Sequence, residues 1–457
     1  MEQMDRREQL AKAPVFPLLV KMSLPAMMGM LVMASYNVVD TIFIGWGVGP
    51  LGIAATSVAF PMQLFVGALA MWIAMGTASL SARKLGAGGM EQAERALGNG
   101  FLMASVLGFI TMFAGLYWLE SIIGLMGADS QVAAHAKAYM KIIFMGNPMV
   151  VLGILMNNTI RSEGNTRYVM YSMTLPAILN VFLDPLFIFT FRMGMEGAAL
   201  ASVIGQFITL VWNLRYYLWK RQSLIPLKIS EMPLRKEAVV EIVSVGASEF
   251  ARQGALTIAN TILMRQLSAY GSALYIAAFS IMMKVASVAV LPIFGLGQGM
   301  LPIVGFCYGA GLHRRARKTI ELSLLSALVI TSVAEVILLA FPHVFVLAFT
   351  DDAEVIRLTV WGVRILQSTF AIVGFQIIGT VVFQALGFAG PALFLSLSRQ
   401  VIFFIPALYV LPKFFGVAGV FACYPFADVA ACAVTLILLL FYRKRFKDLE
   451  KTSQTAL

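Results

Sequence analysis

The stretch VFPLLVKMSLPAMMGMLVMASYNVVDTIFI occupies residues 15–44 and carries a single acidic side chain, Asp40. About 20 consecutive apolar residues are enough to cross a bilayer as a helix. Eleven similar stretches follow at residues 52–82, 96–119, 136–160, 168–191, 197–219, 241–264, 274–308, 320–341, 354–386, 392–411 and 419–442. The 457 residues are 60% hydrophobic and 12% charged, whereas soluble domains carry about 25% charged residues. The sequence therefore predicts an all-α polytopic membrane protein with twelve transmembrane helices.

The segment between the sixth and seventh apolar stretches is basic and contains two prolines. Such a composition is typical of a linker. We therefore predict an N-terminal six-helix lobe at residues 1–219, a cytoplasmic linker at 220–240, a C-terminal six-helix lobe at 241–442 and a basic cytoplasmic tail at 443–457.

The two halves of the chain repeat one another. Leu85-Gly86-Ala87-Gly88 corresponds to Tyr308-Gly309-Ala310-Gly311, and Gly164 corresponds to Gly387, at a constant offset of 223 residues. Six helices in each half keep the orientation, so we predict a parallel repeat of two pseudo-symmetric six-helix bundles. The alternative is that similar glycine-rich loops recur because helix ends favour glycine.

Basic residues gather in alternate gaps between the apolar stretches, with 22 on one side and four on the other. The positive-inside rule then places both termini in the cytoplasm, for a multi-pass protein of the inner (plasma) membrane. Since the net charge of +11 is explained by topology, no nucleic-acid partner is expected. The three cysteines and three histidines are scattered and have no metal-ligand or catalytic spacing. We therefore expect neither an enzyme nor a bound metal or cofactor.

Ionisable residues inside spans are costly and mark functional sites by default. Asp40 and Asp184 lie at similar depths near the outer ends of the first and fifth helices, and nearby amides and a hydroxyl share that level. This predicted cation-coupling site comprises Asp40, Asp184, Asn180, Ser202 and Asn37. Such an oxygen-rich set could hold a proton or a monovalent cation such as Na⁺.

Carboxylates in spans can also be structural. Asp40 could be an interfacial carboxylate near the outer loop, and Asp184 could pair with Arg192 or cap the break at the following proline. In the second half, we expect Glu335 to form an ion pair with Arg364.

Three other polar residues are candidate contacts for a drug in a central cleft: Asn157, Gln253 and Lys284. Asn157 could equally join two helices by an amide hydrogen bond. Pro25, in the lower part of the first helix, lacks a backbone donor and would allow that helix to bend, so we predict a hinge there.

The chain resembles the multidrug and toxic compound extrusion (MATE) family over essentially its full length, and its DinF-like bacterial branch in particular. The residues that carry the resemblance are Ser23-Leu24-Pro25-Ala26, the stretch 37–45 (NVVDTIFIG), Leu85-Gly86-Ala87, Arg161-Ser162-Glu163-Gly164 and the stretch 180–185 (NVFLDP). The resemblance implies two lobes forming a V, alternating access and efflux driven by inward proton or sodium movement. It also implies a cation site at Asp40, Asn180, Asp184 and Ser202, the last often threonine in the family.

These observations together predict a secondary active multidrug efflux transporter that exports lipophilic or cationic xenobiotics in exchange for H⁺ or Na⁺. The expected partners are small-molecule drugs or toxic amphiphiles and membrane lipids, and we expect a monomer. The alternative is a flippase for lipid-linked precursors or polysaccharides. A channel is not favoured, since the two halves differ in charge.

Overall fold

The computed structural model describes residues 2–218, 222–270 and 273–455, and nearly all of them are helical. The chain packs as two compact units. The first contains the residues up to Lys12 and Leu24–Gly246, and the second contains Ala13–Ser23 and the chain from Ala247 onward.

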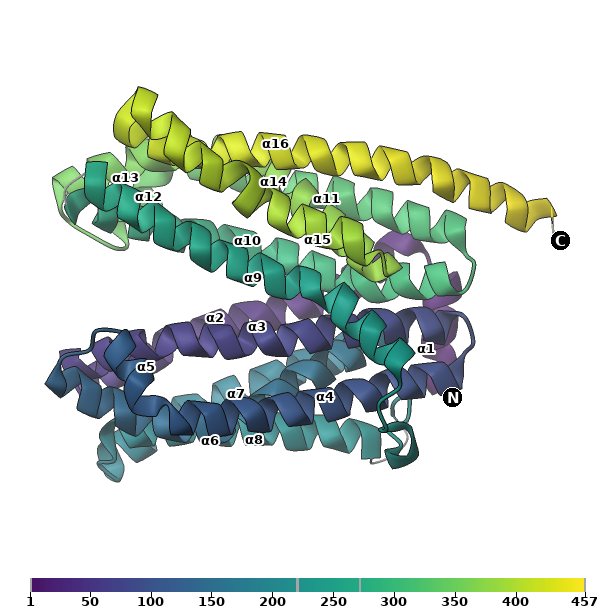
Figure 1. Ribbon diagram of the computed structural model, residues 1–457, viewed down its shortest axis with the longest axis horizontal. Helices are drawn as coiled ribbons and strands as arrows, with labels where there is room; N and C mark the ends of the chain where they lie inside the picture. The colour runs from purple at the N-terminus through teal and green to yellow at the C-terminus, as the bar shows by residue number, and fades with distance from the viewer. Residues whose placement is uncertain (1, 219–221, 271–272, 456–457) are drawn as a thin grey trace. The chain divides into compact units, whose positions relative to one another are not determined.

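In the first unit, α3 and α4 pack on α6, and α8 packs on both α6 and α7 (Figure 1). Its elements, including a π-helical turn η1 and a 3-10 turn η2, are α1 (Glu2–Lys12), α2 (Val15–Gly47), α3 (Pro50–Gly86), α4 (Met90–Tyr117), α5 (Leu119–Leu125), α6 (Ser130–Ser162), α7 (Thr166–Pro185), η1 (Leu186–Thr190), α8 (Gly194–Leu218) and η2 (Ile229–Glu231). Buried apolar side chains, many of them alanines, allow these helices to approach closely.

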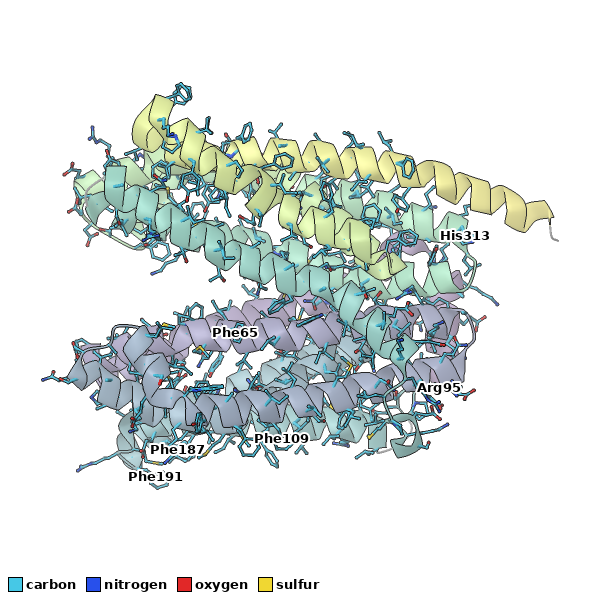
Figure 2. The ribbon with its side chains drawn as sticks, in the orientation of Figure 1. Phe65, Arg95, Phe109, Phe187, Phe191 and His313 are labelled. Carbon is cyan, nitrogen blue, oxygen red and sulfur yellow. The ribbon has the colours of Figure 1, made fainter. Side chains whose placement is uncertain are left out.

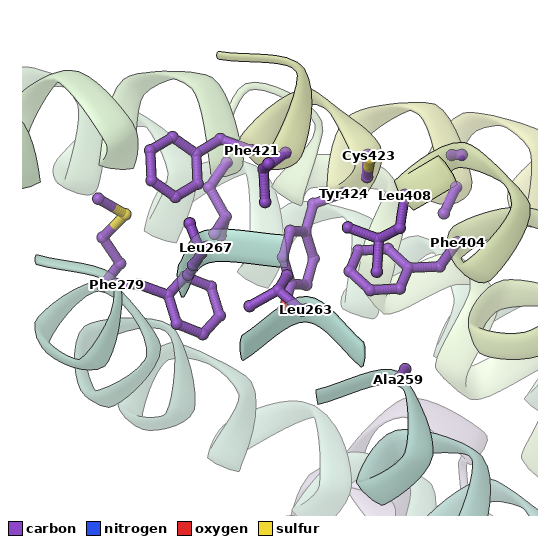
Figure 3. Packing of buried hydrophobic residues seen from close by; sticks show 14 of the residues in the cluster. Ala259, Leu263, Leu267, Phe279, Phe404, Leu408, Phe421, Cys423 and Tyr424 are labelled. Atoms are coloured by element: carbon purple, nitrogen blue, oxygen red, sulfur yellow. The ribbon is translucent and has the colours of Figure 1, made fainter. Parts of the chain in front are cut away.

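In the second unit, α10, α11 and α14 pack together, and α16 packs on α13 and α14. Its elements are α9 (Lys236–Tyr270), α10 (Ala273–Gly309), α11 (His313–Ala340), α12 (Pro342–Leu347), α13 (Ala353–Leu366), α14 (Phe370–Leu386), α15 (Ala389–Leu397), the π-helical η3 (Ser398–Phe404) and α16 (Ile405–Thr455). Figure 3 shows its aromatic core, where the rings of Phe279 and Phe421 stack with centroids 6.4 Å apart and Phe404 lies 4.6 Å from Tyr424.

Helices α2 and α9 each belong to both units. The chain enters the first unit at Leu24 and leaves it before Ala247, and these positions are 223 residues apart, the offset of the sequence repeat. Each short first segment is therefore packed with the helices of the opposite half.

In both units, a glycine allows close packing of the short segment that comes from the opposite half. The two glycines occupy equivalent positions of the repeat. A Cβ on Gly76 would lie 2.0 Å from the carbonyl oxygen of Ile242, and a Cβ on Gly299, 223 residues later, would lie 2.7 Å from the Cα of Ser23. These distances leave no room for a side chain, so close backbone contact fixes the exchanged segments and supports the internal repeat.

The units divide the chain at different residues from the predicted lobes. Residues 13–23 pack in the second unit, whereas the segment 222–240 and the start of α9 pack in the first. Ion pairs hold this segment in place, with Lys228 Nζ 2.7 Å from Glu94 and Arg95 Nε 3.1 Å from Glu231. The difference arises because α2 and α9 each contribute their first residues to one unit and the rest of the helix to the other.

The twelve predicted apolar stretches are largely helical where they are described, although the stretch 354–386 is interrupted between α13 and α14. Length and hydropathy alone identify nine spanning helices in the described ranges, or ten if α13 and α14, bent by 54°, count as one broken span. Two features explain why ten spans, and not the predicted twelve, are identified in this way. Helix α9 is not among the nine and carries Glu241, Glu249 and Arg252 within its predicted apolar stretch. In addition, two helices meet within α16 at Gly416, whose φ is 58°.

Large apolar side chains cover the outer surfaces of the helices (Figure 2). Phe109 on α4 is 50% exposed and Phe191 after η1 is 58% exposed. Soluble proteins rarely expose apolar patches of such extent. Together with the long apolar helices, this surface is that of a multi-pass membrane protein.

Candidate functional site

The predicted site centres on the C-terminal end of α7, where Asp184 precedes Pro185. Proline has no backbone N–H and cannot continue the α-helical ladder, and the chain winds into the π-helical turn η1 immediately after it. Such π turns often lie at functional sites. Asp184 is completely buried, and Asn180, one turn earlier, is 2% exposed.

The buried oxygens of this site are not satisfied by the protein. Both carboxylate oxygens of Asp184, Oδ1 of Asp40 and Oδ1 of Asn180 have no hydrogen-bond partner among the described residues. The charges of Asp40 and Asp184 lie close enough to interact. Because buried polar groups are nearly always hydrogen-bonded, these open acceptors are unusual, and their chemistry would suit a proton or a cation.

Two tyrosines complete the site and were missed by the sequence analysis. The hydroxyls of Tyr36 and Ser202 are 3.0 Å apart, and Gln63 Nε2 donates to the hydroxyl of Tyr139 over 3.3 Å. Both phenols lie within electrostatic range of Asp40 and Asp184. Tyr36 stands four residues before Asp40, so helical spacing could have identified it, whereas nothing in the sequence links Tyr139 to Asp40.

The surroundings of the carboxylates are apolar and tightly packed. The adjoining core includes Ile44 and Ile188, both nearly inaccessible. A Cβ on Gly205 of α8 would lie 3.2 Å from the Cβ of Pro176 and 3.3 Å from Oδ1 of Asn180, so glycine allows α8 to approach α7 here. In such a setting an unpaired carboxylate is costly, and the oxygen-only donor set suits a proton or Na⁺.

The structure excludes the structural alternatives for Asp184, pairing with Arg192 and capping of the break at Pro185. Because neither of its carboxylate oxygens has a partner, Asp184 does not pair with Arg192. Asp40 is half-buried rather than fully exposed. Asn37 points elsewhere, since its side chain is exposed and its amide donates to the carbonyl of Met33 over 3.1 Å.

The predicted drug contacts have different environments. Asn157 Oδ1 accepts a hydrogen bond from Asn213 Nδ2 over 3.0 Å, which joins α6 to α8. Gln253 is half-buried on α9. Lys284 on α10 is exposed, and its ammonium lies 5.6 Å from the ring centroid of Phe349. Pro25 lies inside α2, one residue after the chain enters the first unit.

The predicted ion pair between Glu335 and Arg364 is wrong. The carboxylate of Glu335 accepts a hydrogen bond from the backbone N–H of Ala371 over 2.6 Å. Ala371 lies in the first turn of α14, whose N–H groups have no partner within the helix. Glu335 therefore caps α14 from the neighbouring helix α11.

A buried ion pair in the second unit was not predicted as a pair. Asp428 on α16 is 3% exposed and accepts a hydrogen bond from Arg399 Nε over 2.6 Å and a longer one from Thr369 Oγ1 over 3.3 Å. Across the described part of the chain, no group of three or more His, Cys, Asp or Glu side chains could hold a metal ion.

The MatE family model matches residues 25–186 and 252–410. The multidrug export protein MepA of Staphylococcus saprophyticus is 25% identical over 434 residues, covering 95% of each chain, and MepA of Staphylococcus aureus is 25% identical over 430 residues, covering 94% of each. A solved MATE structure in a bent conformation has a TM-score of 0.90 at 24% identity and 99% coverage of both chains. The solved structure of a multidrug resistance MATE family transporter in an outward-facing conformation also has a TM-score of 0.90 at 24% identity. The match covers 96% of this chain and 98% of that transporter. The family match spans both halves of the repeat, and the chain therefore belongs to the MatE family.

Proposed function

We propose that this chain is a secondary active multidrug exporter that moves lipophilic or cationic compounds out of the cell in exchange for protons. Family membership and the MepA relatives, which are named multidrug export proteins, support the transport class. They do not favour the flippase alternative. Such a transporter performs no covalent chemistry on its substrate and needs no bound cofactor beyond its coupling ion.

The observation that carries the coupling proposal is the group of unpartnered buried oxygens at Asp40, Asp184 and Asn180. A proton bound between the two carboxylates would remove a buried charge and supply the missing hydrogen bond. Ser202 is linked to Tyr36, which lies within electrostatic range of both carboxylates. The same oxygens could coordinate Na⁺, which is the alternative coupling ion.

The proposed cycle couples this site to α2. Proton binding at Asp40 and Asp184 changes how tightly α2 packs, and α2 bends near Pro25, where the proline leaves one backbone hydrogen bond unmade. The bend narrows the first lobe and releases drug outward, and proton release to the cytoplasm resets the cycle. The two states differ in affinity for the proton, which is what coupling requires.

In the proposed topology, the protein spans the plasma membrane as a monomer and both termini lie in the cytoplasm. Basic residues support it, since Arg83 and Lys84 end α3, Arg161 ends α6 and Arg315 stands in the first turn of α11. Gln253 and Lys284 are proposed substrate contacts, the latter as a mobile counter-charge.

Everted membrane vesicles test the proposal. Drug uptake is measured first with an imposed proton gradient and then with an imposed sodium gradient. Uptake with the proton gradient alone is expected, and uptake with sodium alone would transfer the coupling to Na⁺. Uptake under neither gradient, with protein present in the membrane, would overturn secondary active export.

Asp40→Asn tests the site itself. The variant keeps the size of the side chain but cannot release a proton, so gradient-driven uptake should be lost while membrane insertion is unchanged. Asn37→Ala is the matched control on the same helix, since the Asn37 side chain is exposed. Unchanged uptake by Asp40→Asn would refute the role of this carboxylate.

A further inference from the structure

A cavity of about 330 Å³ lies in the second unit between α11, α14 and α16, far along the chain from the coupling carboxylates. Three of its lining side chains carry polar groups: Arg317, Glu321 and Tyr442. Most of the remaining wall is hydrocarbon, contributed among others by Leu324, Phe375 and Leu436. The cavity therefore has a polar part and an apolar part, like an amphiphile.

The polar and apolar parts are separated along the helix axes. Arg317 lies in the second turn of α11, and Leu324 stands seven residues later, about 10 Å deeper at 1.5 Å per residue. Phe375 similarly lies about 16 Å along α14 from its end at Leu386. The ring of Tyr442 contacts that of Phe383 near the same end, with centroids 5.1 Å apart. The polar groups thus mark the membrane surface, and the apolar part extends into the hydrocarbon layer.

The charge at the polar end is positive. The first two turns of α11 carry Arg314, Arg315, Arg317 and Lys318 against the single carboxylate of Glu321. Arg314 and Lys318 are exposed and Arg317 is half-buried. Basic groups at the level of the headgroups attract anionic lipids, by about 1 kcal/mol for each Lys or Arg. A neutral apolar compound would gain nothing from this charge.

We propose that this cavity binds an anionic phospholipid of the cytoplasmic leaflet, with one acyl chain between α11, α14 and α16 and its phosphate at Arg317. The acyl chain would occupy an apolar space in which water is unfavourable. The guanidinium of Arg317 has several N–H groups that can donate hydrogen bonds to phosphate oxygens. Because the bound lipid touches three helices, it stabilises the packing of the second unit. The assignment to the cytoplasmic leaflet rests on the proposed topology, but the site is separate from drug transport and does not depend on the proposed coupling mechanism.

The test measures binding of defined lipids to the full-length protein in detergent. Native mass spectrometry and thermal unfolding are followed during titration with phosphatidylglycerol, phosphatidylethanolamine or phosphatidylcholine. Phosphatidylglycerol should bind most tightly and raise the unfolding temperature most. Equal binding of all three lipids would overturn the anionic assignment.

Variants separate the headgroup from the acyl chain. Arg317→Gln should weaken phosphatidylglycerol binding roughly fivefold, as expected for loss of one basic contact at a membrane surface. Arg265→Gln on α9 removes the same charge outside the cavity lining and should leave binding unchanged. Equal affinities for Arg317→Gln and the wild type would place the phosphate elsewhere.

Leu436→Trp tests the apolar part. Leu436 is 46% exposed, so a larger side chain can be accommodated without disrupting the core. The indole should reduce binding of every diacyl lipid, and Leu440→Trp, 53% exposed, provides a second variant if the first is poorly folded. Lipid affinity unchanged in folded variants of both kinds would show that the acyl chain does not enter the cavity.

Glu321→Gln distinguishes an anionic lipid from a zwitterionic one. Removal of this carboxylate should preserve or strengthen phosphatidylglycerol binding, since it removes a repulsive charge. If the natural occupant were phosphatidylethanolamine with its ammonium at Glu321, the same variant would weaken binding and the proposal would be wrong.

Discussion

In the first unit, Asp184 is fully buried and neither carboxylate oxygen has a hydrogen-bond partner, whereas in the second unit Asp428, 3% exposed, accepts hydrogen bonds from Arg399 and Thr369. Glu335 of the second unit is likewise occupied, by the backbone N–H of Ala371. The first unit therefore offers open acidic oxygens, while Asp428 and Glu335 of the second unit join neighbouring helical segments. The two halves thus share an architecture, while the unpartnered carboxylate oxygens of Asp40 and Asp184 lie in the first.

Asp184→Asn tests the open half and should have the largest effect. The amide keeps the shape of the side chain but removes the exchangeable proton, so gradient-driven drug uptake should fall to the level seen without a gradient. Unfolding temperature should be unchanged or higher, because no partner is lost and a costly buried charge is removed. Vesicle uptake and thermal unfolding of the same preparation measure the two effects. Gradient-driven uptake that persists in Asp184→Asn would show that the unpartnered carboxylate does not couple transport to the ion gradient.

Asp428→Asn should give the opposite result. It leaves Arg399 without its carboxylate, and loss of one partner of a buried pair is strongly destabilising. Since the Arg399 side chain keeps 22% exposure, we expect a loss of about 2–3 kcal/mol in the free energy of unfolding. The double variant Asp428→Asn/Arg399→Gln should recover much of this loss. Unfolding in detergent measures it, and a stable Asp428→Asn variant would show that the pair is not structural.

Glu163 is an acid of the first unit whose oxygens do have hydrogen-bond partners. It tests whether such an acid stabilises the fold, as we expect for Asp428 in the second unit. It follows α6, is completely buried and accepts hydrogen bonds from Tyr216 Oη (2.8 Å), Ser223 Oγ (2.6 Å) and the N–H of Leu224 (2.7 Å). Burial, the largest influence, raises the pKa of Glu163 to about 7 despite these donors. The group thus joins α6 and α8 to the segment after them.

The sign of its pH dependence follows from this raised pKa. Between the ordinary value near 4.5 and about 7, folded Glu163 holds a proton that the unfolded chain has released. Its contribution to stability is therefore complete below pH 4.5 and falls as the pH rises through 7. Glu163→Gln should remove this dependence, which amounts to at most about 3 kcal/mol. Glu120→Gln is the control, because Lys137 lowers the pKa of that exposed carboxyl. Parallel unfolding curves for wild type and Glu163→Gln across this range would contradict the assignment.

The acidic residues of the site with unpartnered oxygens could be predicted because such residues are rare inside membrane spans. Carboxylates seldom occur inside spans, so Asp40 and Asp184 could be identified from composition and position alone. Asn180 followed from its place one turn before Asp184. Tyr36 has the same helical relation to Asp40 and could have been included.

The contacts that depend on neighbouring helices were not predictable. The sequence gives no measure of which helices adjoin, so the link of Gln63 to Tyr139 and the pair of Asp428 with Arg399 required the structure. Glu335 was assigned to the wrong partner for a related reason. The break before α14, which exposes the N–H of Ala371, was read as part of one continuous apolar stretch.

Two glycine substitutions give the smallest expected effect and the finest test of packing at the open site. Gly205 lies on α8 against Pro176 and Asn180, with 3.2 Å and 3.3 Å available to a Cβ, whereas Gly254 on α9 has nothing within 4 Å. Replacing glycine with alanine inside a helix is worth about 1 kcal/mol when there is room for the methyl group. Gly254→Ala should therefore raise the free energy of unfolding by up to about that amount.

Gly205→Ala should gain less, because the methyl group must displace Pro176 or the amide of Asn180 by a few tenths of an ångström. The difference between the two variants measures the cost of that contact, independently of helix propensity. The same displacement moves Oδ1 of Asn180, an open acceptor of the proposed coupling site, so the pH dependence of uptake should shift in Gly205→Ala and stay unchanged in Gly254→Ala. Equal gains in stability with identical pH profiles would mean that α7 and α8 adjust without disturbing the site, and that close packing is not what holds its oxygens in place.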